Sequence, residues 1–179
     1  KHGPVKVFAD EYLNFENYDI DSSLNITRVK GFKIFRKFRK AFLVNECLGS
    51  NDVKGIFFDH WKSLEHVKSE YLNKFPTFCL IHSKEINHPL SSSLNFRMNK
   101  AFKKTKFIIA NSKYTKDLAI STGLEVNKIH IINPGTDYPV KIEKEESVKA
   151  KKIFGSGFPR IITVARLDRR KSHQNILMT

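Results

Sequence analysis

The sequence contains few cysteines and no long apolar run. Cys47 and Cys79 are its only two cysteines. Their spacing is not that of a metal ligand set, so we interpret both as reduced, buried thiols of a cytosolic protein. No segment approaches the ~18 consecutive apolar residues of a membrane-spanning helix, and no internal repeat or low-complexity tract is present. These absences argue against a disulfide scaffold, a repeat array and a membrane-spanning helix.

Negative charge is also scarce relative to positive charge. The 179 residues include 32 Lys and Arg against 18 Asp and Glu, a formal net charge of +14. Such an excess indicates an anionic partner, which is a phosphorylated small molecule, a membrane surface or nucleic acid. Apolar side chains are plentiful, at 40% of the residues with fifteen phenylalanines, so a core can form and disorder is not expected. The length suffices for one domain and the beginning of another.

The stretch 107–137 has the pattern of a β-α-β unit. Residues 107–110 form a short apolar run that is typical of a strand covered on both faces. A helix is expected to begin near Tyr114, a second strand to occupy 129–132, and a sharp turn to follow at 133–135. Because strands joined by a helix run in the same direction, we expect a parallel sheet.

The ends of the helix in this unit also have recognisable signals. Asn111 and Ser112 carry side-chain oxygens that can cap its first turn, and Gly123 suits the left-handed position just past its end.

Other segments extend the alternation of strands and helices along the chain. Strands are expected at 5–9, 24–29, 53–58, 77–81 and 161–165, and helices at 32–43, 64–72 and 91–104. The fold class is therefore α/β, a Rossmann-like parallel sheet with flanking helices, followed by the first strand of a second Rossmann-like domain.

Polar side chains follow two of the expected strands. Asp59, His60 and Lys62 come after 53–58, and His82 comes after 77–81. Open α/β sheets bind their ligands at the carboxyl ends of the strands, so these residues are candidates for a binding site. The alternative for His82 is an ordinary, partly buried histidine.

Residues 32–43 are the most amphipathic segment of the chain. On a helical wheel one side collects phenylalanines and the opposite side collects lysines: Phe32, Phe35, Phe38 and Phe42 against Lys33, Lys37 and Lys40. One interpretation is a helix packed on the sheet through its phenylalanines, with a solvated basic back. The other is a helix that faces anionic lipid headgroups.

Three segments in this order resemble glycosyltransferases of the GT-B fold, specifically the large retaining family four. They are IIANSKYT, KIHIINPGTD and IITVARLDRRKSH, which is similar to the family's "vGRL-x-x-x-KG" motif. The spacing of Arg166 and Lys171 matches that last motif. Ala165 and Ser172 replace its usual glycines, so its backbone is less free than in the family.

The resemblance implies a division of the chain into three parts. Residues 1–138 would be an acceptor-side Rossmann-like domain whose first strand precedes Lys1, 139–158 an interdomain linker, and 159–179 the start of a donor-binding domain. The family's Glu-x(7)-Glu motif would follow Thr179. We therefore expect a fragment of a longer protein, inactive by itself.

The resemblance also implies a reaction. Such enzymes move a sugar from a nucleotide-diphosphate donor to an acceptor with retention and without a bound metal, so cations must stabilise the leaving diphosphate. Arg166 and Lys171 would serve there, Arg as a bidentate fork and Lys as a point charge. His82 resembles the histidine that contacts the donor sugar or an acceptor hydroxyl. No cofactor other than the nucleotide sugar is implied.

The resemblance also implies contacts on the acceptor side. Asp59, His60 and Lys62 would touch the acceptor, and Asn133, Gly135 and Asp137 would shape the turn into the cleft. The acceptor class is a glycan or a lipid-linked molecule, such as a cell-envelope polysaccharide. The expected location is cytoplasmic, at the inner face of the cytoplasmic membrane if 32–43 docks there.

Three alternatives remain open from the sequence. One is a nucleotide-sugar epimerase or a phosphorylase of the same fold, and another is a non-catalytic sugar-binding relative. The third is a basic nucleic-acid-binding module, which is disfavoured because the aromatic residues fall on strand or inner-helix positions and no nucleic-acid motif is present.

Overall fold

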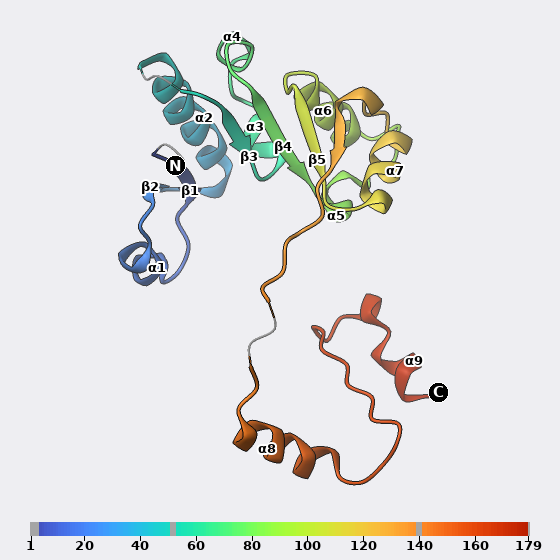
Figure 1. The fold of residues 1–179 in the computed structure, drawn as a ribbon. Coiled ribbons are helices and arrows are strands. Elements are labelled where there is room, and N and C mark those ends of the chain that lie inside the picture. Colours follow the sequence, from blue (N-terminus) through green and yellow to red (C-terminus); the bar gives the residue numbers. More distant parts are fainter. Residues whose placement is uncertain (1–3, 51–52, 139–140, 179) are drawn as a thin grey trace. The chain divides into compact units, whose positions relative to one another are not determined.

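The structure is a computed structural model that describes residues 4–50, 53–138 and 141–178. The chain divides into two compact units, Lys1–Gly135 and Thr136–Thr179, each of which is described by itself (Figure 1). The first unit is α/β, with parallel sheets flanked by helices, as the sequence predicts. The predicted roles of the two parts stay predictions.

The first unit holds two parallel sheets. In one, β1 (Lys6–Asp10) pairs with β2 (Asn25–Val29). In the other, four strands lie side by side in chain order: β3 (Ile56–Phe58), β4 (Thr77–Ile81), β5 (Phe107–Ala110) and β6 (Ile129–Ile131). All three pairings in that sheet are parallel, so the carboxyl ends of its strands share one edge.

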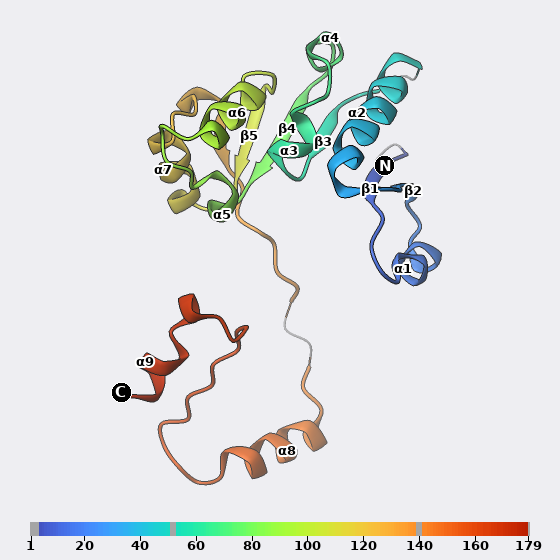
Figure 2. The same ribbon diagram turned by 180° about the vertical axis from the view of Figure 1, so that it is seen from behind.

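Helices connect these strands. They are α1 (Phe15–Asp21), α2 (Lys33–Ser50), α3 (Trp61–Leu64), α4 (Ser69–Leu72), α5 (Ser83–Ile86), α6 (Ser93–Phe102) and α7 (Lys113–Ser121), with a 3-10 turn at Val126–Lys128. Figures 1 and 2 show α3 and α6 on the same face of the four-stranded sheet. Among the described helices, none is both long enough and apolar enough to cross a membrane.

The core lies between the four-stranded sheet and these helices. Alternate residues of β4, namely Thr77, Cys79 and Ile81, are fully buried on the helix side. Burial raises the pKa of the Cys79 thiol well above its usual value, which disfavours the nucleophilic thiolate. Trp61 is the largest fully buried side chain among the described residues, and its indole Nε1–H donates to the Glu85 carbonyl at 3.1 Å. A hydrogen-bonded tryptophan at this point joins α3 to α5.

The opposite face of the sheet is less covered than the sequence predicts. Phe57, Phe78 and Phe107 lie side by side on β3, β4 and β5, with ring centroids 6.1 Å and 4.9 Å apart. Phe57 is exposed and Phe107 is half-buried, whereas Ile108 to Ala110 are buried. The expectation of full cover on both faces holds for three of the four β5 residues.

The packing of α2 is the reverse of the first interpretation of its sequence. Its buried residues are Ala41, Val44 and Leu48, and the phenylalanines expected to pack on the sheet are exposed. These aliphatic side chains are smaller than phenylalanine and allow the helix axis to approach α3 and α4 more closely. The interpretation of a phenylalanine-packed helix is therefore wrong.

Two further predictions for the first unit are wrong in detail. The expected helix over 64–72 is split into α3 and α4, and between them Lys104 Nζ binds the carbonyls of Glu65 and Val67 at 2.8 and 3.0 Å. The sharp turn at 133–135 is absent, and the chain leaves β6 as an exposed, irregular segment. Neither outcome could be predicted from the local sequence pattern. The segment between α3 and α4 contacts a lysine that is distant in sequence, and the segment after β6 is exposed instead of packed.

The second unit contains α8 (Lys144–Phe154), a 3-10 turn at Arg169–Lys171 and α9 (His173–Leu177). The helical turns expected near 147–153 are confirmed and extended in α8, within the predicted linker, whose residues 139 and 140 lie outside the described part of the chain. The strand expected at 161–165 does not form, and its residues are exposed. A strand needs a neighbour to satisfy its backbone N–H and C=O groups, and no described segment pairs with this one.

Candidate functional site

A group of polar side chains lies at the carboxyl edge of the four-stranded sheet. Asp59 and His60 follow β3, His82 follows β4, and Asn111 follows β5. Because these strands are parallel neighbours, their ends bring residues together that are up to 52 positions apart in sequence (Figure 1). This is the edge at which open α/β sheets bind ligands.

His60 is held at the start of α3 through both ring nitrogens. Nδ1 accepts the Lys62 backbone N–H at 3.0 Å, and Nε2 lies 3.2 Å from Oε2 of Glu85. The acceptor role of Nδ1 places the ring proton on Nε2. Burial, followed by the nearby charge of Lys62, lowers the pKa of His60, so the neutral imidazole is favoured. His60 therefore caps α3, and its predicted contact with an acceptor stays a prediction.

Glu85 connects the ends of β3 and β4. Its Oε1 accepts the backbone N–H of His82 at 2.9 Å, while Oε2 lies 3.2 Å from Nε2 of the His60 ring. Burial raises the pKa of Glu85. A single carboxylate on α5 thus sets the relative position of His60 and His82.

His82 is the more exposed of the two histidines in the group. Its Nδ1 lies 3.2 Å from Nδ2 of Asn111, and the residue is exposed. The Asn111 amide is oriented by Thr115, whose hydroxyl donates to Oδ1 at 2.7 Å. Thr115 itself is buried. Asn111 therefore donates to Nδ1, and the His82 proton is carried by Nε2, which is left to bind a ligand.

The start of α7 supports this arrangement. Ser112 is its N-cap and accepts the Thr115 backbone N–H at 3.2 Å, as expected from the sequence. Capping fixes the first turn of α7 and therefore the position of the Thr115 hydroxyl under Asn111.

The remaining candidates of the first unit are more peripheral. Asp59 is exposed and accepts the Ser63 hydroxyl at 3.3 Å, and Lys62 places Nζ 5.6 Å from the centroid of the buried Trp61 ring. Asn133, Gly135 and Asp137 lie on the exposed, irregular segment after β6. The structure thus brings Asp59, His60, Lys62 and His82 to one edge of the sheet. The predicted turn at Asn133, Gly135 and Asp137 does not form.

Arg166 and Lys171 lie in the second unit, on a short folded loop. The His173 ring Nε2 is 2.9 Å from the Arg166 carbonyl, and the Lys171 backbone N–H donates to the Asp168 carbonyl at 2.8 Å. Both cationic residues are exposed. The loop therefore offers two positive charges to solvent even though the strand expected before it is absent.

Three residues of the site were missed as site residues by sequence reasoning: Glu85, Asn111 and Thr115. Asn111 and Thr115 belong to the IIANSKYT segment, in which Asn111 was interpreted as a helix cap and neither residue as part of a site. Asn111 follows β5 as His82 follows β4, so the rule that placed His82 at the sheet edge also applied to Asn111. For Glu85, the position three residues after His82 matches a helix-capping pattern.

No cluster of three or more His, Cys, Asp or Glu side chains suited to a metal ion occurs among the described residues. The comparisons with known proteins add no relative: no family model, curated protein or solved structure matches the chain. What the structure itself defines is an α/β protein with parallel sheets, flanking helices and a histidine-bearing carboxyl edge.

Proposed function

We propose that the chain is the acceptor-side domain, with the beginning of the donor-binding domain, of a retaining glycosyltransferase of the GT-B fold, family four. The observation that carries the proposal is the oriented His82 ring at the end of β4. Its Nδ1 is occupied by Asn111, so it presents one Nε2–H donor at the edge where such sheets bind ligands.

A single N–H donor suits a hydroxyl or phosphate oxygen. A neutral imidazole can hydrogen-bond the hydroxyl of a sugar or acceptor without adding a charge to the site. The neighbouring His60 and Glu85 bind each other and hold the edge in shape, so in this proposal they position His82 rather than meet the substrate.

In this proposal, Arg166 and Lys171 bind the diphosphate of the donor. Both are exposed on a loop shaped by hydrogen bonds of His173 and Asp168, and metal-independent transfer needs cations at the leaving group. The proposed acceptor is a glycan or lipid-linked molecule, and the proposed location is the cytoplasm, at the inner face of its membrane.

The first experiment is a calorimetric titration of UDP, GDP and ADP into the protein expressed from the complete reading frame that contains this sequence. We expect one nucleotide to bind, and the double variant Arg166→Ala, Lys171→Ala to weaken it at least ~10-fold, because each charge-assisted hydrogen bond contributes roughly 1.5–3 kcal/mol. The matched control is Lys144→Ala, Lys149→Ala on α8. Equal affinity in both double variants would refute the assigned role.

The second experiment tests His82 by glycosyl transfer to saccharide acceptors in the same protein. His82→Ala is expected to lower kcat/KM, whereas His130→Ala, a change at an exposed histidine of β6, is expected to leave it unaltered. Wild-type kinetics in His82→Ala would remove His82 from the site. The proposal also requires a Glu-x(7)-Glu motif within about 150 residues downstream, roughly one domain.

A further inference from the structure

Helix α2, together with Phe32 just before its first residue, carries a row of phenylalanines that faces solvent. Phe32, Phe35, Phe38 and Phe42 are 84, 60, 49 and 60% exposed. Their spacing places them on one side of the helix as an apolar strip, in which the Phe38 ring also packs against His66 with the centroids 4.4 Å apart. Isolated apolar residues are ordinary on a protein surface, but a strip of four phenylalanines marks a surface that contacts something apolar.

The orientation of this strip is set by contacts on the other side of α2. Ala41, Val44 and Leu48 are buried in the core. Arg36 donates to the Glu11 carbonyl at 2.9 Å, and Lys40 pairs with Asp10 at 2.8 Å. Rotating the helix to bury the phenylalanines would break these contacts, so the exposure is a property of the folded unit.

The surroundings of the strip are strongly basic. Helix α2 carries five cations and one carboxylate, Glu46, a net charge of +4. Lys37 Nζ lies 4.8 Å from the centroid of the Phe38 ring. Aromatic rings and cations are therefore interleaved on one helix, as in helices that lie in the headgroup region of a bilayer.

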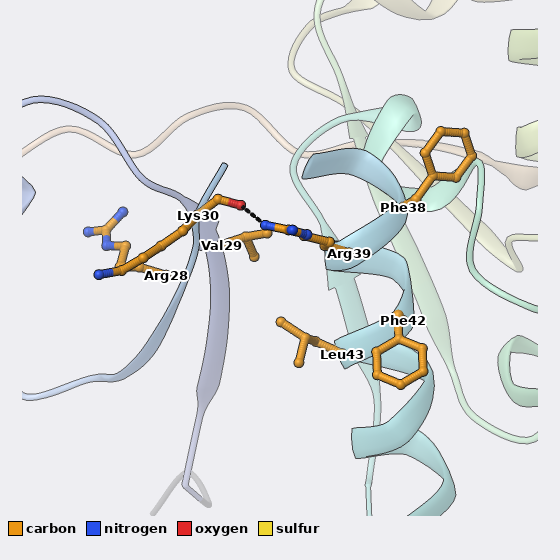
Figure 3. Close-up of a pocket in the computed structure, with 7 residues that line it drawn as sticks. All are labelled: Arg28, Val29, Lys30, Phe38, Arg39, Phe42 and Leu43. Carbon is orange, nitrogen blue, oxygen red and sulfur yellow. Dashed lines mark hydrogen bonds between the residues drawn. The ribbon is translucent and has the colours of Figure 1, made fainter. Parts of the chain in front are cut away.

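A groove of about 600 Å³ runs beside the strip, between α2 and β2 (Figure 3). Arg39 reaches across it to donate to the Lys30 carbonyl at 2.9 Å, and in Figure 3 Phe38 and Phe42 point away from this contact. Arg28 in its lining is already paired with Asp19, so Lys30 and Arg39 are the cations that the lining offers to a ligand. The lining residues are Arg28, Val29, Lys30, Phe38, Arg39, Phe42 and Leu43. Cations above an apolar floor suit a phosphate headgroup with the start of its acyl chain.

We propose that this surface of α2 docks the protein onto a bilayer of anionic phospholipids. The phenylalanines enter the boundary between headgroups and acyl chains, and Lys33, Lys37 and Arg39 contact the lipid phosphates. A second copy of the chain is a poorer occupant, because two surfaces of the same positive sign repel. The proposal does not depend on glycosyl transfer.

The test is flotation of the full chain with vesicles of phosphatidylcholine alone, or of phosphatidylcholine and phosphatidylglycerol at about three to one. We expect at least ~10-fold tighter binding to the anionic vesicles, decreasing as salt rises, because each cation near such a surface contributes about a five-fold factor. Equal binding to the two vesicle types, or binding to neither, would overturn the proposal.

Two variants test the two parts of the surface. Phe38→Ser with Phe42→Ser is expected to lower anionic-vesicle binding at least ~10-fold, from the loss of buried apolar area. Its control is Phe96→Ser, since Phe96 is 69% exposed on α6. Lys33→Gln with Lys37→Gln is expected to lower anionic-vesicle binding by ~10-fold or more. Its control is Lys103→Gln with Lys113→Gln, which is expected to have a smaller effect.

Fluorescence of Trp61, the only tryptophan and a fully buried one, reports whether each variant remains folded. Folded Phe38, Phe42 variants that bind vesicles as the wild type does would overturn the proposal. So would light scattering that shows a stable dimer abolished by these same substitutions, because the second copy would then be the occupant.

Discussion

Nδ2 of Asn111 lies 3.2 Å from Nδ1 of His82, although the two residues are 29 positions apart and follow different strands. The contact exists because β4 and β5 are parallel neighbours that end at the same edge. Since Thr115 orients the Asn111 amide, the contact also determines which nitrogen of His82 carries the proton. A tautomer that is set by structure can be measured without knowing the substrate.

We predict that His82 carries its proton on Nε2 in the wild type and that this changes with residue 111. In Asn111→Asp a carboxylate replaces the amide donor, so the proton is expected to move to Nδ1, where it can be donated to Asp. Asn111→Leu is expected to give a mixture of both tautomers. Long-range ¹H–¹⁵N correlation spectra of the histidine rings measure this directly.

The assignment and control for that experiment use other histidines. Loss of one ring signal set in His82→Gln identifies His82, and the signals of His130 are expected to stay unchanged in every variant. A wild-type spectrum with the proton on Nδ1 would contradict the geometry, and an unchanged tautomer in Asn111→Asp would show that Asn111 does not control it.

We predict a pH-dependent stability difference between the wild type and His60→Asn. Asparagine can also cap α3, so the two proteins should have similar free energies of unfolding at pH 7.5. The pKa of His60 is lowered by burial, so as the pH falls through the ordinary histidine pKa of 6.5 the unfolded chain takes up a proton that the folded ring resists. The wild type therefore loses stability relative to the variant on acidification.

Urea unfolding followed by Trp61 fluorescence between pH 7.5 and 6.0 measures this difference. The solvent-exposed His130→Asn variant serves as the control. A difference that stays constant, or one that grows in favour of the wild type as the pH falls, would be inconsistent with a buried neutral His60.

We predict that Glu65 and Arg97 are energetically coupled. Arg97 binds both carboxylate oxygens of Glu65, at 2.7 and 2.8 Å, and joins α6 to the end of α3. Because Arg97 is partly exposed, we expect a coupling free energy of only about 1 kcal/mol at pH 7. The hydrogen bonds from Arg97 lower the pKa of Glu65, so the coupling is present above the usual value of 4.5 and is lost as the pH falls through the lowered pKa.

A double-mutant cycle with Glu65→Gln and Arg97→Met measures the coupling. Strictly additive losses of stability at pH 7 would show that the pair contributes nothing beyond its separate contacts.

We predict opposite effects of alanine at two glycines. Gly123 ends α7 with φ +93°, so Gly123→Ala is expected to lower the free energy of unfolding by about 1–2 kcal/mol, although the nearest atom to a new Cβ is 3.6 Å away. Gly49 lies in α2, where alanine is preferred, so Gly49→Ala is expected to raise it by up to about 1 kcal/mol. Equal effects in chemical denaturation would contradict the assigned backbone conformations.

The parts that sequence reasoning predicted correctly depend on short segments. The apolar runs at β4, β5 and β6, the Ser112 cap and the left-handed Gly123 are all properties of fewer than about ten residues, and periodicity and capping rules act on that scale. The edge position of His82 follows from the same runs, because a strand's end is visible in the sequence.

The sequence by itself determined that this protein has an α/β first unit with parallel strands, and that His60 and His82 follow neighbouring strands. Only the tertiary structure decided that Asn111 orients His82, that His60 is a cap bound to Glu85, and that the phenylalanines of α2 face outward. The reason is that an amphipathic pattern shows two faces without saying which one is covered. Partners beyond the helix, here Asp10 and Glu11 on one side of α2, decide the orientation.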